Sequence, residues 1–344
     1  MSAKRQNQAL CLDQEKYARN REVAMAPILS VIITAYNEGD YLFEAIHSVQ
    51  QQTLADLEII LVDDGSTGPT KEIIDGMVEP GLFIIRQDNQ GPAAARNAGI
   101  QATRGKYVGF LDGDDCWYPE KAASHIEILE QHSGVDLTYG WWRFVDEGGN
   151  DTARRGKPNK KPVELQDLIK QNFIGSASNV IARKEALFAA GLFDPNLRAA
   201  EDMEFWIRMA RLREDNLHCI PKILFDYRVR KGQLSKNWQK MFQDSQKVFE
   251  KVRDLEPELV AAVEHEAYAV RKRYLAYLAY EASDYPASRK LLFEALRMKP
   301  DVLLERSAFF TIAAILCTYL PERIHSAMAK SVQDLRMKIT DMRS

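Results

Sequence analysis

Cysteine and long apolar runs are both scarce in this chain. Its four cysteines lie far apart and form no C-x-x-C pair, which argues against a zinc knuckle or a disulfide framework and favours a reducing compartment. The longest apolar run covers residues 308–320, whereas a membrane-spanning helix needs about 20 apolar residues. The sequence therefore predicts a buried helix there, with an interfacial helix as the alternative.

Neither sign of charge dominates. The 46 Lys and Arg residues against 49 Asp and Glu residues give a net charge of −3, so we expect no nucleic-acid partner. Residues 1–26 are polar and contain no apolar core of the length that a secretory signal needs. We therefore expect a polar N-terminal extension over residues 1–26 of a cytoplasmic protein, with a peripheral position at the inner membrane face as the alternative.

Motifs of several common enzyme classes are absent. The chain has no G-x-G-x-x-G, H-E-x-x-H or G-x-S-x-G sequence. These absences argue against a nicotinamide-dinucleotide site, a zinc protease and a serine hydrolase of the usual kinds.

Four apolar segments in the first half predict strands, and helical patterns separate them. The apolar residues of the first strand are largely β-branched, as is typical of strands buried on both faces. Strands are expected at residues 28–35, 57–62, 82–87 and 106–112, and helices at 41–52, 70–78 and 91–103. This alternation predicts an α/β fold with a doubly wound, mostly parallel sheet, whose ligands bind beyond the carboxyl ends of the strands.

Polar or acidic residues occur at the ends of three of these predicted strands. They lie at residues 34–38, at 63–64 and at 112–115. An Asp-Gly pair is also a common turn, so the segment "LDGDD" alone does not separate a turn from a cation site. Three such ends along one edge of a sheet favour a binding site.

From residue 139 the pattern changes. Residues 139–152 predict two strands joined by a turn, and the basic segment 153–162 predicts a mobile surface loop or a lid that contacts the acceptor. Residues beyond about 240 predict helices, of which 273–300 are patterned like one tetratricopeptide-type helix pair. An amphipathic stripe over 324–339 makes the C-terminal helices candidates for peripheral membrane contact or homo-oligomerisation.

Three segments resemble family 2 glycosyltransferases of the GT-A fold. They are "SVIITAYNEGDYLFEAIHSVQQQTLADLEIILVDDGSTGPT", "GPAAARNAGIQATRGKYVGFLDGDDCWYP" and "GLFDPNLRAAEDMEFWIRMA", within about residues 28–232. The resemblance implies a GT-A domain over residues 27–235 and a C-terminal α-helical region over 236–344. It also implies an inverting transferase that moves a hexosyl or related sugar from a nucleotide-diphosphate sugar donor. The acceptor would be a sugar, a lipid-linked molecule or a protein in cell-surface or extracellular glycan biosynthesis.

The resemblance further implies a metal site. The family's D-x-D motif falls on Asp112 and Asp114, which would bind Mn²⁺ or Mg²⁺, and Asp112 would also touch the donor. Asp115 could replace either acid. Such hard cations prefer oxygen ligands, and they stabilise the negative charge on a departing diphosphate.

Other donor contacts are carried over onto neighbouring strand ends. Thr34, Tyr36 and Glu38 would bind the nucleoside, together with Asp64. Tyr36 can stack on a base while Asp64 accepts a hydrogen bond from a ring N–H. The alternative for Asp64 is that it satisfies the backbone of its own turn.

Three charged residues complete the expected site. Arg96 would approach the diphosphate from the start of a helix, with a structural ion pair as the alternative. Asp202 matches the family's catalytic base, with a helix-capping acid as the alternative. Arg230 stands where many relatives have a metal-binding histidine; an arginine cannot bind a cation, but it can pair with a diphosphate, so we expect weaker metal binding. The Q-x-x-R-W signature of processive synthases is absent, which favours a non-processive enzyme.

Two other functions remain as alternatives. A nucleotidyltransferase would carry a basic, Gly-rich loop after the first strand, and residues 34–40 contain no Lys or Arg. A degenerate transferase domain that acts as a binding or scaffold protein would tolerate the loss of Asp112, Asp114 and Asp202, all of which are intact.

Overall fold

The structure is a computed structural model that groups the chain into two units, each formed by segments from different parts of the sequence. It describes residues 25–77, 81–158, 163–230, 232, 233, 237–301, 312, 313, 315, 316, 318 and 319. Unit 1 comprises Met1–Trp142, Ser176–Pro195 and Asn216–Tyr227, and unit 2 comprises Arg143–Gly175, Asn196–Asp215 and Arg228–Ser344. The expected domain boundary near residue 235 stays a prediction, as does the polar N-terminal extension, which lies almost wholly outside the described residues.

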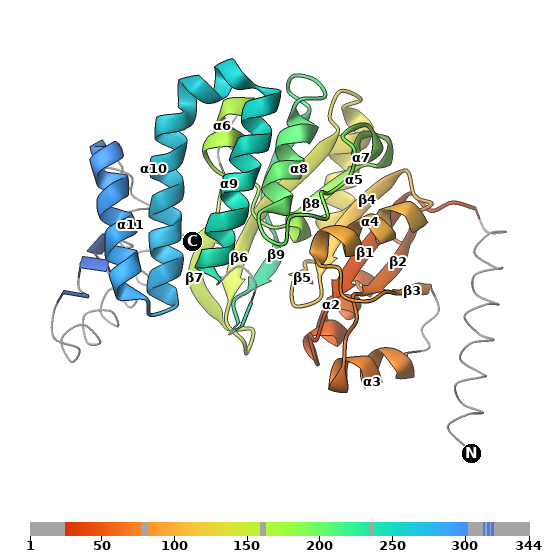
Figure 1. Ribbon diagram of the computed structural model, residues 1–344. Coiled ribbons are helices and arrows are strands. Elements are labelled where there is room, and N and C mark those ends of the chain that lie inside the picture. The colour runs from red at the N-terminus through yellow and green to blue at the C-terminus, as the bar shows by residue number, and fades with distance from the viewer. Residues whose placement is uncertain are drawn as a thin grey trace. The chain divides into compact units, whose positions relative to one another are not determined.

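Four parallel strands form one half of the sheet (Figure 1). They are β1 (Leu29–Ala35), β2 (Leu57–Asp63), β3 (Leu82–Arg86) and β4 (Tyr107–Asp112), in the order β3-β2-β1-β4. Because helices connect these strands on both faces, the central strands β1, β2 and β4 are almost completely buried and their residues are mostly apolar. The predicted doubly wound sheet is confirmed here.

The other half of the sheet contains the antiparallel pairs. From β4 the order continues through β8 (Val180–Arg183), β6 (Leu137–Val145), β9 (Leu217–Arg228) and β5 (Cys116–Trp117), while β7 (Asp151–Gly156) pairs with β6. The pairs β4–β8, β6–β8 and β5–β9 are antiparallel. The loop predicted at 153–162 is wrong over residues 153–156, which complete β7; residues 159–162 lie outside the described residues.

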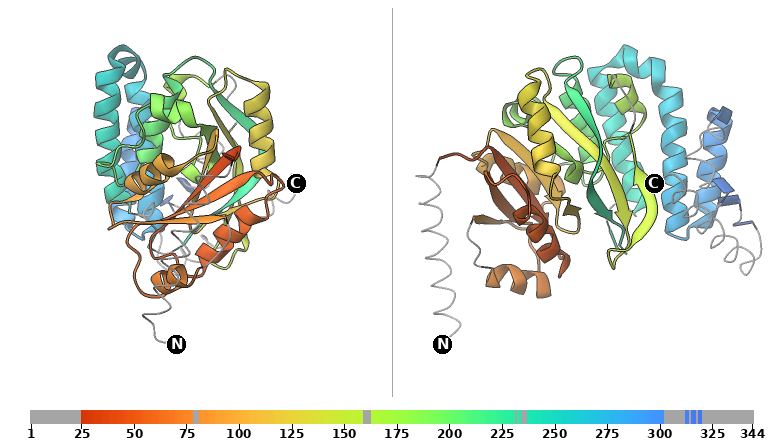
Figure 2. Two further views of the ribbon diagram at one scale, coloured as in Figure 1. Left: turned by 90° about the vertical axis from the view of Figure 1, so that its right-hand side faces the viewer. Right: turned by 180° about the vertical axis from the view of Figure 1, so that it is seen from behind.

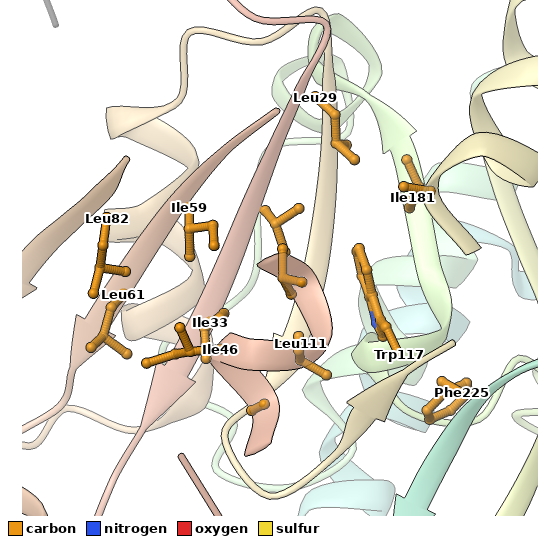
Figure 3. Close-up of a cluster of buried hydrophobic side chains, with 14 of the residues drawn as sticks. Leu29, Ile33, Ile46, Ile59, Leu61, Leu82, Leu111, Trp117, Ile181 and Phe225 are labelled. Atoms are coloured by element: carbon orange, nitrogen blue, oxygen red, sulfur yellow. The ribbon is translucent and has the colours of Figure 1, made fainter. Parts of the chain in front are cut away.

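The helices of unit 1 pack on the buried strands. They are α2 (Tyr41–Gln50), α3 (Gly68–Gly76), α4 (Pro92–Ala102), α5 (Lys121–Gln131), η1 (Ala177–Asn179) and α7 (Lys184–Ala189). Figure 3 shows the aliphatic side chains of β1, β2 and β4 meeting Ile46 of α2 and Trp117 in one core cluster. Helix α4 comes so close to β1 that a Cβ on Gly99 would lie 2.5 Å from the Ile32 side chain, so only glycine fits there.

Unit 2 is mainly helical. Its helices are α6 (Leu165–Lys170), α8 (Glu201–Ala210), α9 (Trp238–Leu255), α10 (Pro257–Glu281) and α11 (Tyr285–Met298). Helices α10 and α11 lie side by side (Figures 1 and 2), which confirms the predicted helix pair, and the Asp284 side chain accepts a hydrogen bond from the Ala287 N–H at the start of α11. The predicted amphipathic stripe at 324–339 lies outside the described residues. Among the described helices, none combines the length and the hydropathy that crossing a membrane requires.

A lysine is completely buried within unit 1. Lys121 Nζ donates a hydrogen bond to the Asn179 carbonyl at 2.8 Å and lies 3.1 Å from His125 Nε2, while the rings of Trp117 and Phe225 are 5.1 and 5.5 Å away. Burial lowers the pKa of Lys121 well below its usual value, and burial together with the lysine charge also lowers the pKa of His125. Burying the amine therefore favours its uncharged form.

Replacing this lysine should remove a pH dependence of stability. The pKa of Lys121 is lower in the folded chain than in the unfolded one. Between these two pKa values the unfolded chain binds more protons, so the free energy of unfolding of the wild type rises with pH by up to about 1.4 kcal/mol per pH unit. The melting temperature of Lys121→Met relative to wild type should therefore be higher near pH 7 than near pH 9. Thermal unfolding at several pH values measures this, with the exposed Lys290→Met as control; a difference that stays constant would contradict it.

Candidate active site

The carboxyl ends of β1 and β4 lie level with each other. In the sheet register Thr34 is opposite Asp112, and Ala35 is opposite Asp63 at the end of β2. Thr34 Oγ1 donates a hydrogen bond to Asp112 Oδ1 at 3.2 Å, and the Thr34 carbonyl accepts one from the Gly113 N–H at 2.9 Å. The predicted gathering of polar strand ends along one edge is therefore present in unit 1.

An ion pair dominates the end of β4. Arg96 of α4 donates to Asp112 Oδ1 at 2.8 Å; the arginine side chain is 5% exposed and the aspartate side chain 25% exposed. The backbone N–H of Asp112 donates to Ser178 Oγ at 3.0 Å, which fixes the strand end on a second side. The structure thus contains the ion pair that the sequence left open for Arg96, and a contact of Arg96 with a diphosphate stays a prediction.

The D-x-D segment is a tight turn. The Asp115 N–H donates to the Asp112 carbonyl at 3.0 Å, and Asp114 and Asp115 are almost completely buried. A Cβ on Gly113 would lie 2.9 Å from the Thr34 carbonyl oxygen and 3.0 Å from Glu38 Cγ, so the turn accepts only glycine there. It follows that Glu38 lies beside the turn, as predicted for a residue of the same site.

The donor atoms here suit a hard cation. In the part of the chain that the structure describes, no three His, Cys, Asp or Glu side chains converge as a metal cluster. Mg²⁺ in enzymes commonly takes only one or two carboxylates and completes its shell with phosphate oxygens and water. Asp112 and Asp114 fit such a partial oxygen site, and their role as metal ligands stays a prediction.

Asp64 supports the loop before α4. This buried carboxylate accepts hydrogen bonds from Gln87 Nε2 at 2.7 Å, from the Gln90 N–H at 2.9 Å and from the Gly91 N–H at 2.7 Å. The turn that follows β2 is instead satisfied by Asp63, which accepts the Ser66 N–H at 2.9 Å. Neither sequence interpretation of Asp64 anticipated these contacts, and its bond to a nucleobase stays a prediction.

Tyr36 lies on the surface at the end of β1. Its side chain is 47% exposed, so its ring is accessible to a planar partner. The next residue, Asn37, has φ at 61° and accepts the Thr67 N–H at 2.8 Å, while its own N–H donates to Ser66 Oγ at 3.2 Å. These bonds fasten the segment after β1 to the segment after β2 and fix the position of Tyr36.

Asp202 belongs to unit 2 and is the second residue of α8. Its Oδ1 accepts the Met203 N–H at 2.6 Å, and its Oδ2 accepts a hydrogen bond from Asn172 Nδ2 at 3.2 Å. Asn172 is itself fixed by a bond from Nδ2 to the Gly175 carbonyl at 2.9 Å. Sequence analysis missed Asn172, because no local pattern marks a residue that lies 30 positions before its partner.

Ala200, directly before the helix, has φ at 60°, which is a strained conformation for alanine.

A second missed residue, Asp244 of α9, fixes the segment before α8. Its carboxylate is completely buried and accepts the N–H groups of Arg198 at 3.1 Å and Ala199 at 3.0 Å. Burial opposes its ionisation, but bonds from Lys247, Lys240 and these two backbone groups outweigh burial and lower the pKa of Asp244. The helix carrying Asp202 thus begins at a point that α9 determines.

Arg230, the remaining predicted residue, is half-buried and also belongs to unit 2. Thr34, Tyr36, Glu38, Asp64, Arg96, Asp112 and Asp114 all belong to unit 1. The role of Arg230 in donor binding and the role of Asp202 as a base therefore stay predictions. For Asp202, the hydrogen bonds with Met203 and Asn172 show how its carboxylate is held within unit 2.

The contacts of Asp64 predict a structural effect. Asp64→Asn should lower the free energy of unfolding by about 2 kcal/mol, because an amide group would face one of three donors that now bond a carboxylate. Chemical denaturation measures this, and the exposed Asp254→Asn serves as a matched control. Unchanged stability of Asp64→Asn would show that the three bonds contribute little to the fold.

Comparison with known proteins identifies the family and the fold of the chain. The family profile described as "Glycosyl transferase family 2" matches residues 30–188. An uncharacterized glycosyltransferase of Methanocaldococcus jannaschii is 30% identical over 209 residues, which are 59% of this chain and 71% of that protein.

Two solved structures share the fold. S. aureus TarS 1-349 in complex with UDP-GlcNAc has a TM-score of 0.55 at 18% identity, covering 92% of this chain and 91% of that one. The mannosyltransferase PcManGT of Pyrobaculum calidifontis, in complex with GDP-Man and Mn²⁺, has a TM-score of 0.55 at 16% identity, covering 96% and 94%. From its sequence likeness and its fold together, the chain belongs to the family 2 glycosyltransferases and is an enzyme with the GT-A fold.

Proposed function

We propose that this enzyme is a metal-dependent, inverting, non-processive transferase that moves a sugar from a nucleoside-diphosphate donor to an acceptor hydroxyl. The observation that carries the proposal is the group formed by Thr34, Arg96 and Asp112 at the level ends of β1 and β4. Ligands of doubly wound sheets bind at such strand ends. We place the reaction in the biosynthesis of a cell-surface glycan, with a sugar, a lipid-linked molecule or a protein as acceptor.

The chemistry of the donor explains the residue types. Two solved structures with this fold contain UDP-GlcNAc or GDP-Man, and the second also contains Mn²⁺. Here Asp112 and Asp114 would hold Mn²⁺ or Mg²⁺, which as a Lewis acid stabilises the charge on a departing diphosphate, typically by several kcal/mol. Arg96 and Arg230 would contribute cationic contacts to the same diphosphate.

The remaining donor residues orient the nucleoside. The exposed ring of Tyr36 can stack on the base, which orients the donor without fixing base identity. Glu38 and Thr34 lie beside the D-x-D turn, close enough to share a ligand with Asp112. Asp64 would act on the same site mainly by fixing the loop that leads into α4.

Asp202 would act as the base on the acceptor side. As the acceptor oxygen bonds to the anomeric carbon, the bond from that carbon to the diphosphate breaks on the opposite face, and the hydroxyl proton passes to the carboxylate of Asp202. The Met203 N–H and Asn172 fix the direction of this carboxylate. The product is a glycoside of inverted configuration and a nucleoside diphosphate.

Donor binding should depend on metal and on Asp114. A ligand that binds only the folded chain raises its melting temperature by mass action. A screen of UDP-, GDP- and dTDP-sugars by thermal shift should find a donor that stabilises the wild type more with Mn²⁺ than without it. Asp114→Asn should lose the metal-dependent part, while the exposed Asp254→Asn keeps it. A metal-dependent shift that survives in Asp114→Asn would remove Asp114 from the metal site.

Loss of the base should separate binding from chemistry. With the donor found in that screen, Asp202→Asn should keep the thermal shift of the wild type and lower the transfer rate by about 10²–10⁴-fold, the usual contribution of a general base. The rate is measured as nucleoside diphosphate released in the presence of acceptor. Turnover within a few fold of wild type would exclude Asp202 as the base.

A further inference from the structure

Arg154, a half-buried arginine of unit 2, makes contacts with aromatic rings and has no carboxylate partner among the described residues. The guanidinium of Arg154 in β7 lies 4.4 Å from the ring centroid of Phe144 and 5.4 Å from that of Tyr277. Within the described ranges of the chain, no carboxylate lies at ion-pair distance from it. Its neighbour Arg155, by contrast, pairs with Asp151 at 2.6 Å. Among the described residues, the side-chain contacts of the Arg154 guanidinium are thus with two aromatic rings.

The backbone is irregular directly before this side chain. Ala153 has φ at 55°, a conformation that is strained for an L residue, and its N–H donates to Asp151 Oδ1 at 2.7 Å. Irregularities of this kind in a strand change the direction of the next side chain and are common beside functional sites. The sequence predicted a mobile surface loop here, or a lid that contacts the acceptor, and did not predict a strand.

Tyr274 connects Arg154 with the proposed base. Tyr274 and Tyr277 are three residues apart on α10 and share one face of the helix. Although 46% of Tyr274 is exposed, its hydroxyl lies among many protein atoms; this desolvation, and then the charge of Asp202, raise the pKa of Tyr274 to about 12, while Arg154 opposes the shift. Tyr274 is thus a residue of α10 whose electrostatic surroundings include both Asp202 and Arg154.

The packing of unit 2 agrees with these surroundings. Helix α6 packs against α10, which carries the two tyrosines, and against α8, which carries Asp202. Arg154 also faces Tyr277 of α10 directly. The guanidinium of Arg154 faces α10, the helix of Asp202 is α8, and α6 packs against both of these helices within unit 2.

A guanidinium on aromatic rings is suited to binding anions. Ring contacts attract the cation without neutralising it, and its N–H groups can bind phosphate or carboxylate through two parallel hydrogen bonds. We propose that Arg154, with Tyr274 and Tyr277, forms an acceptor subsite for an anionic group, a phosphate ester or a carboxylate, on the molecule that receives the sugar. This inference rests on the proposed function, because the role of Asp202 as base is what makes this side of unit 2 the acceptor side.

Calorimetric titration of the full chain tests the subsite. The charged probes are glycerol 3-phosphate and glucuronate, and their neutral counterparts are glycerol and glucose. Wild type should bind at least one charged probe more tightly than its counterpart, and Arg154→Gln should weaken that binding about tenfold or more. Arg154→Lys should lie between the two, while Arg297→Gln, an exposed charge-matched control, should bind as wild type does. Preference for glycerol 3-phosphate assigns a phosphate-bearing acceptor, and preference for glucuronate assigns a carboxylate-bearing one.

Two results would overturn the subsite: equal binding by wild type and Arg154→Gln, or no preference of wild type for charged over neutral probes. Should Arg154→Gln not fold, Arg154→Lys keeps the charge and the stem, and unweakened binding by that variant overturns the subsite equally. Thermal shifts with the nucleotide sugar should be the same in Arg154→Gln and wild type. The two proposals can fail separately. If anion binding depends on Arg154 but no nucleotide sugar raises the melting temperature of the chain, the proposed function is refuted and the anion-binding site is not.

Discussion

The level ends of β1 and β4 are the constraint on which the proposed donor site depends. Because parallel strands share their hydrogen-bond register, burial of β1 and β4 in the core fixes Thr34 opposite Asp112. Arg96 is nearly completely buried, and a buried guanidinium without an anion costs several kcal/mol, so the pair with Asp112 stabilises both members. The positions of Thr34, Asp112 and Arg96 are therefore fixed by the buried strands and by the ion pair.

In unit 2, the position of Asp202 is likewise fixed by hydrogen bonds to residues that are distant in the sequence. Asp202 begins a helix whose preceding residues are fixed by the buried carboxylate of Asp244, and its own carboxylate is oriented by Asn172. These supports come from α9 and from the segment after α6, far from Asp202 in the chain. Helix α9 thus helps to fix the residues of the proposed acceptor side.

Sequence alone predicted the parts of the fold that depend on local composition. The strands 29–35, 57–63 and 107–112 follow from β-branched, apolar runs, and the polar ends at Thr34 and Asp112 follow from the rule that such strands end on one edge. What it could not predict depends on distant pairing. Asp64 bonds residues 23 to 27 positions away, and these pairs are set by how α4 docks.

The prediction of a loop from residue 153 onward was wrong over residues 153–156 for a related reason. Its composition is that of a solvated loop, yet Arg154 lies between a ring of β6 and a ring of α10. Ring contacts of this kind allow a charged residue to enter a folded strand, because they replace part of the lost hydration without a counter-ion. No rule based on local charge can distinguish such an arginine from a surface one.

The first turn of α8 suggests what kind of base Asp202 would be. The start of the helix carries partial positive charge, and the N–H of Met203 and the amide of Asn172 both favour the ionised carboxylate. The acceptor hydroxyl gives up its proton as the new bond forms, so the base must lie in line with that hydroxyl at the moment of transfer. On the proposed role, the contacts of Asp202 therefore contribute direction more than basicity: they determine which hydroxyl can deliver its proton, and so which acceptor geometry reacts.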